Sequence, residues 1–169
     1  MATKVRLNSL VMDSITDGIG VNLVLVFQGC KANCPGCHNP HTHDEQAGEE
    51  FDIESLFSRY TTEITTGVTL SGGEPLLQPD AIREASRIAH ARGYKVTLYT
   101  GFIEDKFKES LPDYAELLDY VKCGPYVDSL RSSKCPLYGS SNQHFYVVKK
   151  TGELVEVFSD TDARKVESE

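Results

Sequence analysis

The sequence has little of what a nucleic-acid-binding, membrane-spanning or disulfide-stabilised protein requires. Lysine and arginine total 17 against 25 aspartates and glutamates, which gives a net charge of -8. Sequence-independent binding of nucleic acid needs a basic face, so this balance argues against it. The longest apolar run, Leu23 to Phe27, is far too short to span a bilayer, and residues 1–10 lack the apolar segment of a signal peptide. We therefore expect a soluble, cytoplasmic protein that binds neither membrane nor nucleic acid.

Cysteine is also scarce. The chain has five, an odd number, and three of them fall within eight residues. A disulfide-stabilised scaffold would spread its cysteines, whereas in a reducing compartment this crowding is typical of metal-binding or catalytic thiols. The 169 residues suffice for one domain with a proper core. We expect a single domain over residues 1–158 and a polar tail, 159–169, whose composition is typical of disorder.

Short apolar runs alternate with amphipathic ones along the chain. The predicted strands are residues 21–27, 68–70, 95–100, 120–123 and 144–149, and the predicted helices are residues 52–60, 79–92 and 114–118. Such alternation is typical of an α/β fold with a mostly parallel sheet and covering helices. Three loops of chemical character, residues 29–40, 71–75 and 100–102, each follow a predicted strand. They should therefore meet at the carboxyl edge of the sheet, where α/β folds place their sites.

The three crowded cysteines, Cys30, Cys34 and Cys37, have the spacing CxxxCxxC. Three thiolates can hold a four-iron cluster and leave one iron without a protein ligand, so that a small molecule can bind there. The spacing alone leaves three other interpretations open. They are a structural zinc site completed by a histidine, a dithiol redox pair formed by Cys34 and Cys37, and a set of unrelated buried thiols. The histidines near enough to complete a zinc site are His38, His41 and His43.

A glycine-rich loop, Ser71-Gly72-Gly73-Glu74-Pro75, follows the second predicted strand. Two adjacent glycines let the backbone approach a ligand closely, and unpaired carbonyl and amide groups of such a loop can hold an amino group and a carboxylate. The alternative is a tight turn between a strand and a helix. The position of the loop, one helix after the cysteine loop, favours ligand binding. The two remaining cysteines, Cys123 and Cys135, are interpreted as incidental.

Taken together, several runs resemble those of the radical S-adenosylmethionine activating enzymes, and most closely those of the group that activates the anaerobic (class III) ribonucleoside-triphosphate reductase. The matching runs, in the order of the family, are Asp17-Gly18-Ile19-Gly20, Phe27-Gln28-Gly29-Cys30, Cys34-Pro35-Gly36-Cys37-His38-Asn39-Pro40, Leu70-Ser71-Gly72-Gly73-Glu74-Pro75-Leu76, Tyr99-Thr100-Gly101 and Gly139-Ser140-Ser141-Asn142-Gln143. The cysteine run marks the superfamily, and the last run is the more discriminating. The positions that depart from the family pattern are Ile19, Asn22, Cys123 and Tyr138.

The resemblance implies an incomplete (β/α) barrel of the radical S-adenosylmethionine type, with a mostly parallel sheet and helices outside, since a full barrel needs about 250 residues. It also implies an oxidoreductase with one [4Fe-4S] cluster that uses S-adenosyl-L-methionine. A one-electron donor such as a flavodoxin reduces the cluster, and cleavage of S-adenosylmethionine gives a 5′-deoxyadenosyl radical. This radical takes a hydrogen atom from a glycine of the large reductase subunit, where a glycyl radical remains.

The resemblance assigns roles residue by residue. The implied cluster ligands are Cys30, Cys34 and Cys37. The implied S-adenosylmethionine contacts are Gly36, Cys37 and His38 in the wall of the cysteine loop, Gly72, Gly73 and Glu74 at the methionyl end, and Thr100 on the nucleoside side. No side chain beyond the cluster ligands is implied to be catalytic. The substrate loop of the reductase is expected to enter against residues 139–143.

Three alternatives stand beside this interpretation. The first is an activase of another glycyl radical enzyme, of the pyruvate formate-lyase type. The second is a small-molecule radical enzyme such as a 7-carboxy-7-deazaguanine synthase. The third is not an enzyme but a zinc-binding interaction module. The short chain and the run at residues 139–143 favour the reductase activase among the enzymes.

Overall fold

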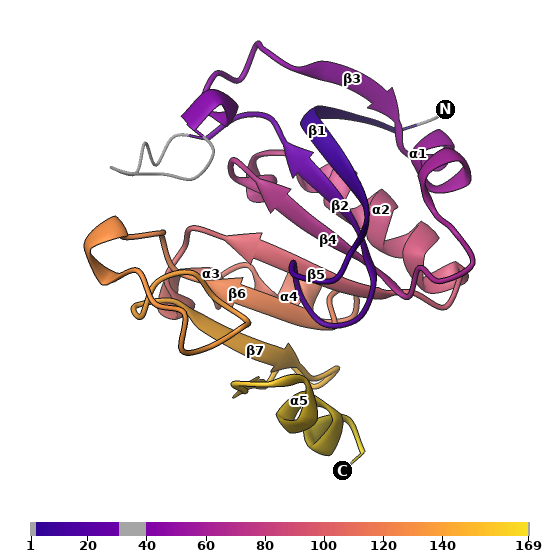
Figure 1. Ribbon diagram of the computed structural model, residues 1–169. Helices are drawn as coiled ribbons and strands as arrows, with labels where there is room; N and C mark the ends of the chain where they lie inside the picture. Colours follow the sequence, from indigo (N-terminus) through magenta and orange to yellow (C-terminus); the bar gives the residue numbers. More distant parts are fainter. Residues whose placement is uncertain (1–2, 31–39, 169) are drawn as a thin grey trace.

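The computed structural model describes residues 3–30 and 40–168, which form one mixed sheet flanked by helices (Figure 1). The strands lie in the order β3-β1-β2-β4-β5-β6-β7-β8. Their bounds are β1 Lys4–Ser14, β2 Asn22–Phe27, β3 Glu49–Asp52, β4 Gly67–Gly72, β5 Lys95–Thr100, β6 Tyr120–Cys123, β7 His144–Val148 and β8 Leu154–Glu156. The helices are α1 Ile53–Tyr60, α2 Pro79–Ala91, α3 Glu104–Phe107, α4 Leu111–Tyr114 and α5 Asp160–Glu167, with single 3-10 turns η1 Pro40–Thr42, η2 Pro75–Leu77 and η3 Asp128–Leu130.

The centre of the sheet is parallel and its flanks are antiparallel. β2 pairs with β4, β4 with β5 and β5 with β6, all in parallel. β1 and β3 add antiparallel pairs on one side, and β7 and β8 add them on the other. The expectation of a mostly parallel sheet is therefore wrong outside the centre, where all four strand pairs are antiparallel. Short loops join β1 to β2 and β7 to β8, and such loops allow only antiparallel pairing, since a parallel neighbour needs a long crossover. Within the described residues the sheet ends at β3 and β8 and does not close into a barrel.

The sequence predicted the central strands and β7, and it missed β1, β3 and β8. Residues 95–100 and 120–123 are confirmed as β5 and β6, while 21–27, 68–70 and 144–149 correspond to β2, β4 and β7 with small shifts at their ends. The long strand β1 was not predicted, because only Val5, Leu7 and Ser14 of its residues are buried. β1 has few buried residues, and some of its exposed residues are apolar. The alternation of apolar and polar residues that marks a half-buried strand is therefore too weak to recognise.

Helices α1 and α2 form where the sequence predicts them. The side chain of Asp52 caps α1 by accepting a backbone hydrogen bond in its first turn, and Ile53, Leu56 and Phe57 are buried along one face. Helix α2 is followed by Gly93, whose φ of +79° is the left-handed conformation that glycine adopts most easily. These two helices cross over between the parallel strands, as the alternating pattern indicated.

Two expectations about the second half of the chain are wrong. The short helix predicted at residues 114–118 lies earlier, as α4, with a proline in its first turn where proline is favoured. The tail predicted to be disordered forms α5 instead. Ser159 caps α5 by accepting a hydrogen bond of 3.1 Å from the Asp162 amide, and Ala163 is fully buried. One buried alanine in a polar segment is too small a signal to find from the sequence.

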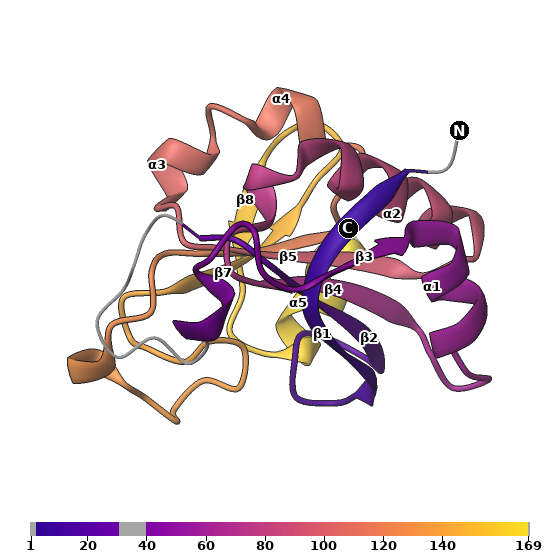
Figure 2. The same cartoon turned by 90° about the horizontal axis from the view of Figure 1, so that it is seen from above.

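Strand side chains alternate between two cores on opposite faces of the sheet. Val121 and Tyr146 pack with residues of α1, α2, α3 and α4 in the larger core, whereas Tyr120 and Phe145 pack with Ala163 of α5 in the smaller one. Figure 2 shows α3 and α4 on one side of the strands and α5 on the other. The sequence led us to expect helices on one face of the sheet, the outside of an incomplete barrel. That expectation is wrong for α5, which lies on the other face. Among the described residues, no helix has both the length and the apolar character needed to cross a membrane.

Candidate functional site

The parallel strands end at a common edge, and a cleft of about 200 Å³ opens there. Its lining includes five of the residues that the sequence singled out, which are Cys30, Gly72, Gly73, Glu74 and Thr100. They lie at or directly after the carboxyl ends of the neighbouring strands β2, β4 and β5. The predicted meeting of these loops at the carboxyl edge is thus confirmed. The other predicted site residues, Cys34, Gly36, Cys37 and His38, lie outside the described residues.

The two glycines let the glycine loop pack directly on the backbone beside Cys30. Gly72 has a φ of +109°, and a Cβ on it would lie 2.5 Å from the carbonyl oxygen of Phe27. A Cβ on Gly73 would lie 2.2 Å from the carbonyl oxygen of Gly29 and 3.2 Å from Cβ of Cys30. Hydrogen bonds of 2.9 Å from the Gly73 amide to Phe27 and of 2.7 Å from the Glu74 amide to Gly29 join the same segments. No side chain fits in this contact.

Glu74 presents a buried carboxylate to the cleft. Its Oε1 accepts hydrogen bonds from the Thr100 hydroxyl at 2.7 Å and from the Gly101 amide at 2.8 Å, and its Oε2 accepts one from the Leu76 amide at 3.2 Å. Burial raises the pKa of this carboxyl, and the three hydrogen bonds oppose that shift. No lysine, arginine or histidine pairs with Glu74 among the described residues. The arrangement suits a ligand that brings its own positive charge.

The segment that carries the cysteines is closed at its base. The amide of Gly29 donates a hydrogen bond of 2.6 Å to the carbonyl of Thr42. The amide of Cys30 donates one of 3.3 Å to the carbonyl of His43. The side-chain amide of Gln28, a buried residue, donates to the carbonyls of His41 at 3.1 Å and of Asp44 at 2.6 Å. The two ends of the segment are therefore held together by hydrogen bonds, and its first cysteine is fixed at the edge of the cleft.

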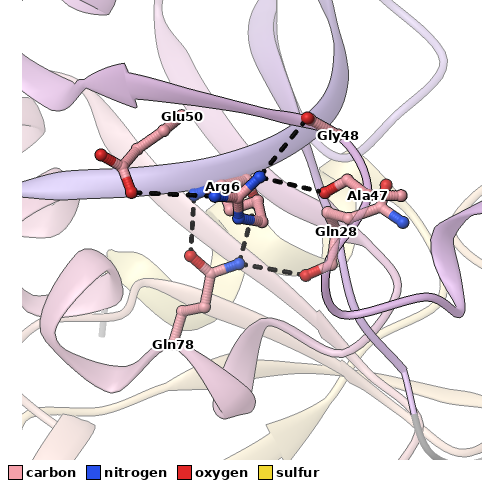
Figure 3. Close-up of polar contacts among 6 residues, drawn as sticks. All are labelled: Arg6, Gln28, Ala47, Gly48, Glu50 and Gln78. Atoms are coloured by element: carbon pink, nitrogen blue, oxygen red, sulfur yellow. Dashed lines mark hydrogen bonds and ion pairs between the residues drawn. The ribbon is translucent and has the colours of Figure 1, made fainter.

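A second layer of hydrogen bonds, drawn in Figure 3, ties this segment to the sheet and to the glycine loop. Gln78, directly after η2, donates from Nε2 to the carbonyls of Arg6 at 2.9 Å and Gln28 at 3.2 Å, and its Oε1 accepts from the Arg6 amide. The guanidinium of Arg6 reaches the carbonyls of Ala47 at 3.3 Å and Gly48 at 3.4 Å. One polar cluster thus links β1, the two ends of the cysteine segment and Gln78, which follows the glycine loop and η2.

The run from Gly139 to Gln143 shapes the opposite wall of the cleft. The Oε1 atom of buried Gln143 accepts hydrogen bonds from the amides of Gly139 at 2.9 Å and Ser140 at 3.1 Å, and its Nε2 donates to the carbonyl of Gly124 at 3.1 Å. The side-chain amide of Asn142 donates at 2.8 Å to another carbonyl of this wall. These side-chain amides hold the wall together, so their donors are engaged within the protein.

Sequence reasoning did not single out Lys122, which also lines the cleft. Its Nζ lies 3.8 Å from the centre of the Tyr99 ring, a cation–π contact between neighbouring strands. Burial lowers the pKa of Lys122 to about 8, and the negative charge of Asp17 opposes that shift. It is the only lysine or arginine among the described residues that line the cleft. The signal that could have found it is a charged residue inside the otherwise apolar run of residues 120–123.

Similarity to known proteins agrees with this site. A family described as "4Fe-4S single cluster domain" matches residues 16–146. The chain is 34% identical over 113 residues to a pyruvate formate-lyase-activating enzyme of Clostridium pasteurianum, a match that covers 63% of this chain and 48% of that enzyme. It is also 30% identical over 122 residues to the pyruvate formate-lyase 1-activating enzyme of Escherichia coli K12. The aligned region covers 69% of this chain and 50% of that enzyme. This chain thus matches about half the length of these two relatives.

A third relative is matched over almost its whole length. The anaerobic ribonucleoside-triphosphate reductase-activating protein of Escherichia coli K12 is 30% identical over 138 residues, which is 76% of this chain and 90% of that protein. The family match spans the cysteine segment, the glycine loop and the wall at residues 139–143. The chain therefore belongs to the 4Fe-4S single cluster domain family, among the radical S-adenosylmethionine activating proteins, and resembles the anaerobic ribonucleoside-triphosphate reductase-activating protein.

Proposed function

We propose that this protein activates the anaerobic ribonucleoside-triphosphate reductase by generating a glycyl radical on its large subunit, with a [4Fe-4S] cluster and S-adenosylmethionine as cofactors. The observation that carries the proposal is the contact of the glycine loop with the backbone of Gly29 and Cys30, which places Glu74 and the first cysteine in one cleft. The match over 90% of the reductase-activating protein supports the choice of reductase.

The described residues fit these two cofactors. Cys30 supplies a thiol at the rim of the cleft, and Cys34 and Cys37 are proposed as the other two ligands of the cluster. Glu74 supplies a carboxylate without a cationic partner among the described residues, as the amino group of S-adenosylmethionine requires. Gly72 and Gly73 line the cleft, and their lack of side chains lets the glycine loop pack on residues 27–30, which holds Glu74 beside Cys30.

The chain contributes binding, orientation and exclusion of water, while the bound cofactors supply the radical chemistry. Thr100 and Gly101 each donate a hydrogen bond to Oε1 of Glu74, which fixes the carboxylate toward its ligand. We propose that Gly36, Cys37 and His38 enclose S-adenosylmethionine from the cysteine segment. Thr100 then acts on the methionyl end through Glu74 rather than by a free hydroxyl.

The open sheet suits a substrate that is itself a segment of protein. Residues 124–126, Gly139 and Gln143 and the turn at Asp17 also line the cleft. We propose that the glycine loop of the reductase enters between them, and that the chain adopts the incomplete barrel of the family around it. A flavodoxin or a similar one-electron donor is the proposed reductant.

One other partner is favoured by a specific observation. The 34% identity to a pyruvate formate-lyase-activating enzyme makes pyruvate formate-lyase the second candidate substrate. Both can be tested in one experiment, in which the anaerobically reconstituted protein is incubated with reductant, S-adenosylmethionine and either large enzyme. Electron paramagnetic resonance then counts glycyl radicals on each. We expect radicals on the reductase, and a higher count on pyruvate formate-lyase would overturn the choice of partner.

A further inference from the structure

Lys122 and Tyr99 form a pair on the face of the sheet opposite helices α1 to α4. In the parallel register of β5 and β6, Tyr99 lies beside Lys122 and Thr100 lies beside Cys123. Val121 and Cys123 point into the core beneath those helices, so Lys122 points to the other face. There its ammonium lies over the Tyr99 ring and lines the cleft together with Asp17.

The ammonium of Lys122 has hydrogen bonds left to donate. A lysine carries three N–H donors. In the part of the chain that the structure describes, the Tyr99 ring is its only close partner, and Asp17 acts on it only through its charge. Asp17 itself accepts a hydrogen bond of 2.6 Å from the Ser14 hydroxyl. A partly buried cation with unused donors, at the wall of a cleft, is suited to bind an acceptor on a ligand.

The position of Lys122 points away from the methionyl group of S-adenosylmethionine. Glu74 follows β4, whereas Lys122 lies on β6, and β5 runs between them. Two strand spacings amount to about 10 Å. The amino and carboxylate groups of a methionyl end sit on one carbon, so a ligand whose amino group binds Glu74 keeps its carboxylate near β4. The acceptor for Lys122 is therefore not the methionyl carboxylate, which leaves the protein loop as a candidate to supply it.

We propose that Lys122 is a substrate-binding residue that donates a hydrogen bond to a main-chain carbonyl beside the target glycine of the incoming protein loop. The inference rests on the proposed function. A glycine has no side chain to be recognised, so only its backbone can orient a Cα hydrogen toward the reacting group. The Tyr99 ring holds the ammonium of Lys122 in place, and the negative charge of Asp17 favours its protonated form.

The test compares Lys122→Met and Lys122→Arg with Lys95→Met, which removes a lysine at the far end of β5 beside Asp119. Each reconstituted variant is assayed for bound iron, for S-adenosylmethionine affinity by equilibrium dialysis, and for glycyl radical formation against reductase concentration. We expect Lys122→Met to raise the apparent KM for the reductase about tenfold. Its S-adenosylmethionine affinity should stay within about twofold of wild type, and Lys95→Met should stay near wild type in both. Lys122→Arg keeps a charged donor that also stacks on an aromatic ring, so it should raise the KM less than Lys122→Met does.

Two results would overturn the inference. One is a weakened affinity of Lys122→Met for S-adenosylmethionine with an unchanged KM for the reductase, which would make the lysine a cofactor ligand. The other is an unchanged KM together with unchanged affinity. If wild type cleaves S-adenosylmethionine but places no radical on the reductase, the proposed function fails instead. If Lys122→Met does not bind iron, Lys122→Arg can still test the inference. The KM of the wild type for the reductase should rise above pH 8, where Lys122 loses its proton, and the KM of the arginine variant should not.

Discussion

Replacing Gly73 by alanine tests whether the glycine loop positions the first cysteine. The new Cβ would lie 2.2 Å from the carbonyl oxygen of Gly29, whereas ordinary contacts begin near 3.4 Å. The loop and the cysteine segment must therefore separate by roughly 1 Å. This movement also breaks the hydrogen bond of 2.7 Å from the Glu74 amide to the same carbonyl. Both partners of the contact are backbone, so no side chain can rotate away to relieve it.

The expected effect follows from these two losses. Overpacking costs about 1–3 kcal/mol and a lost hydrogen bond about 1 kcal/mol, so the free energy of unfolding should fall by about 2–4 kcal/mol. A shift of about 1 Å at the binding wall should lower the rate of S-adenosylmethionine cleavage about a hundredfold. Urea unfolding measures the first quantity, and the yield of 5′-deoxyadenosine per cluster measures the second.

A matched control is Gly139→Ala on the other wall of the cleft. A Cβ there would lie 3.5 Å from the Tyr126 ring, an ordinary contact, and this glycine needs no left-handed conformation. The control should keep wild-type stability and wild-type iron content. The reasoning is refuted if Gly73→Ala also unfolds within about 0.5 kcal/mol of wild type and cleaves S-adenosylmethionine at a similar rate.

Three further predictions follow. Cys34→Ala should abolish the glycyl radical signal and Cys135→Ala should leave it nearly unchanged, because Cys135 is buried in the smaller core and does not line the cleft. Equal signals in electron paramagnetic resonance would contradict this. Affinity for the reductase should fall as pH rises through about 8, where Lys122 loses its proton, and a flat pH profile would contradict it. Burial raises the pKa of Glu74 above 4.5, so the folded, cofactor-free protein binds a proton more tightly than the unfolded chain. Its stability should therefore fall as pH rises from 4.5 through the raised pKa, and Glu74→Gln should remove that fall in urea titrations at several pH values.

The centre of the fold was predictable because its signals are local and strong. β2, β4, β5 and β6 are short, apolar and separated by amphipathic helices, and the helix that Asp52 caps starts where the cap indicates. The strands β1, β3 and β8 were missed because most of their residues are exposed or half buried. The tail was misjudged for a related reason, since α5 is held by one buried alanine, Ala163, and a serine cap.

The candidate site was only partly predictable. The meeting of Cys30 with the glycine loop followed from two strand ends at one edge of a parallel sheet. The role of Thr100 as a donor to Glu74 did not, because a hydrogen bond between two loops cannot be read from either loop alone. Gln143 is the clearest case: the motif was recognised, but its side chain builds the wall of the cleft.

The measurement that tests the account most directly is the electron paramagnetic resonance spectrum of the anaerobic reductase after incubation with the reconstituted protein, reductant and S-adenosylmethionine. The account predicts a glycyl radical signal that requires both S-adenosylmethionine and intact Cys30. A protein with a full iron-sulfur cluster that cleaves S-adenosylmethionine and yet leaves the reductase without this signal would contradict the account.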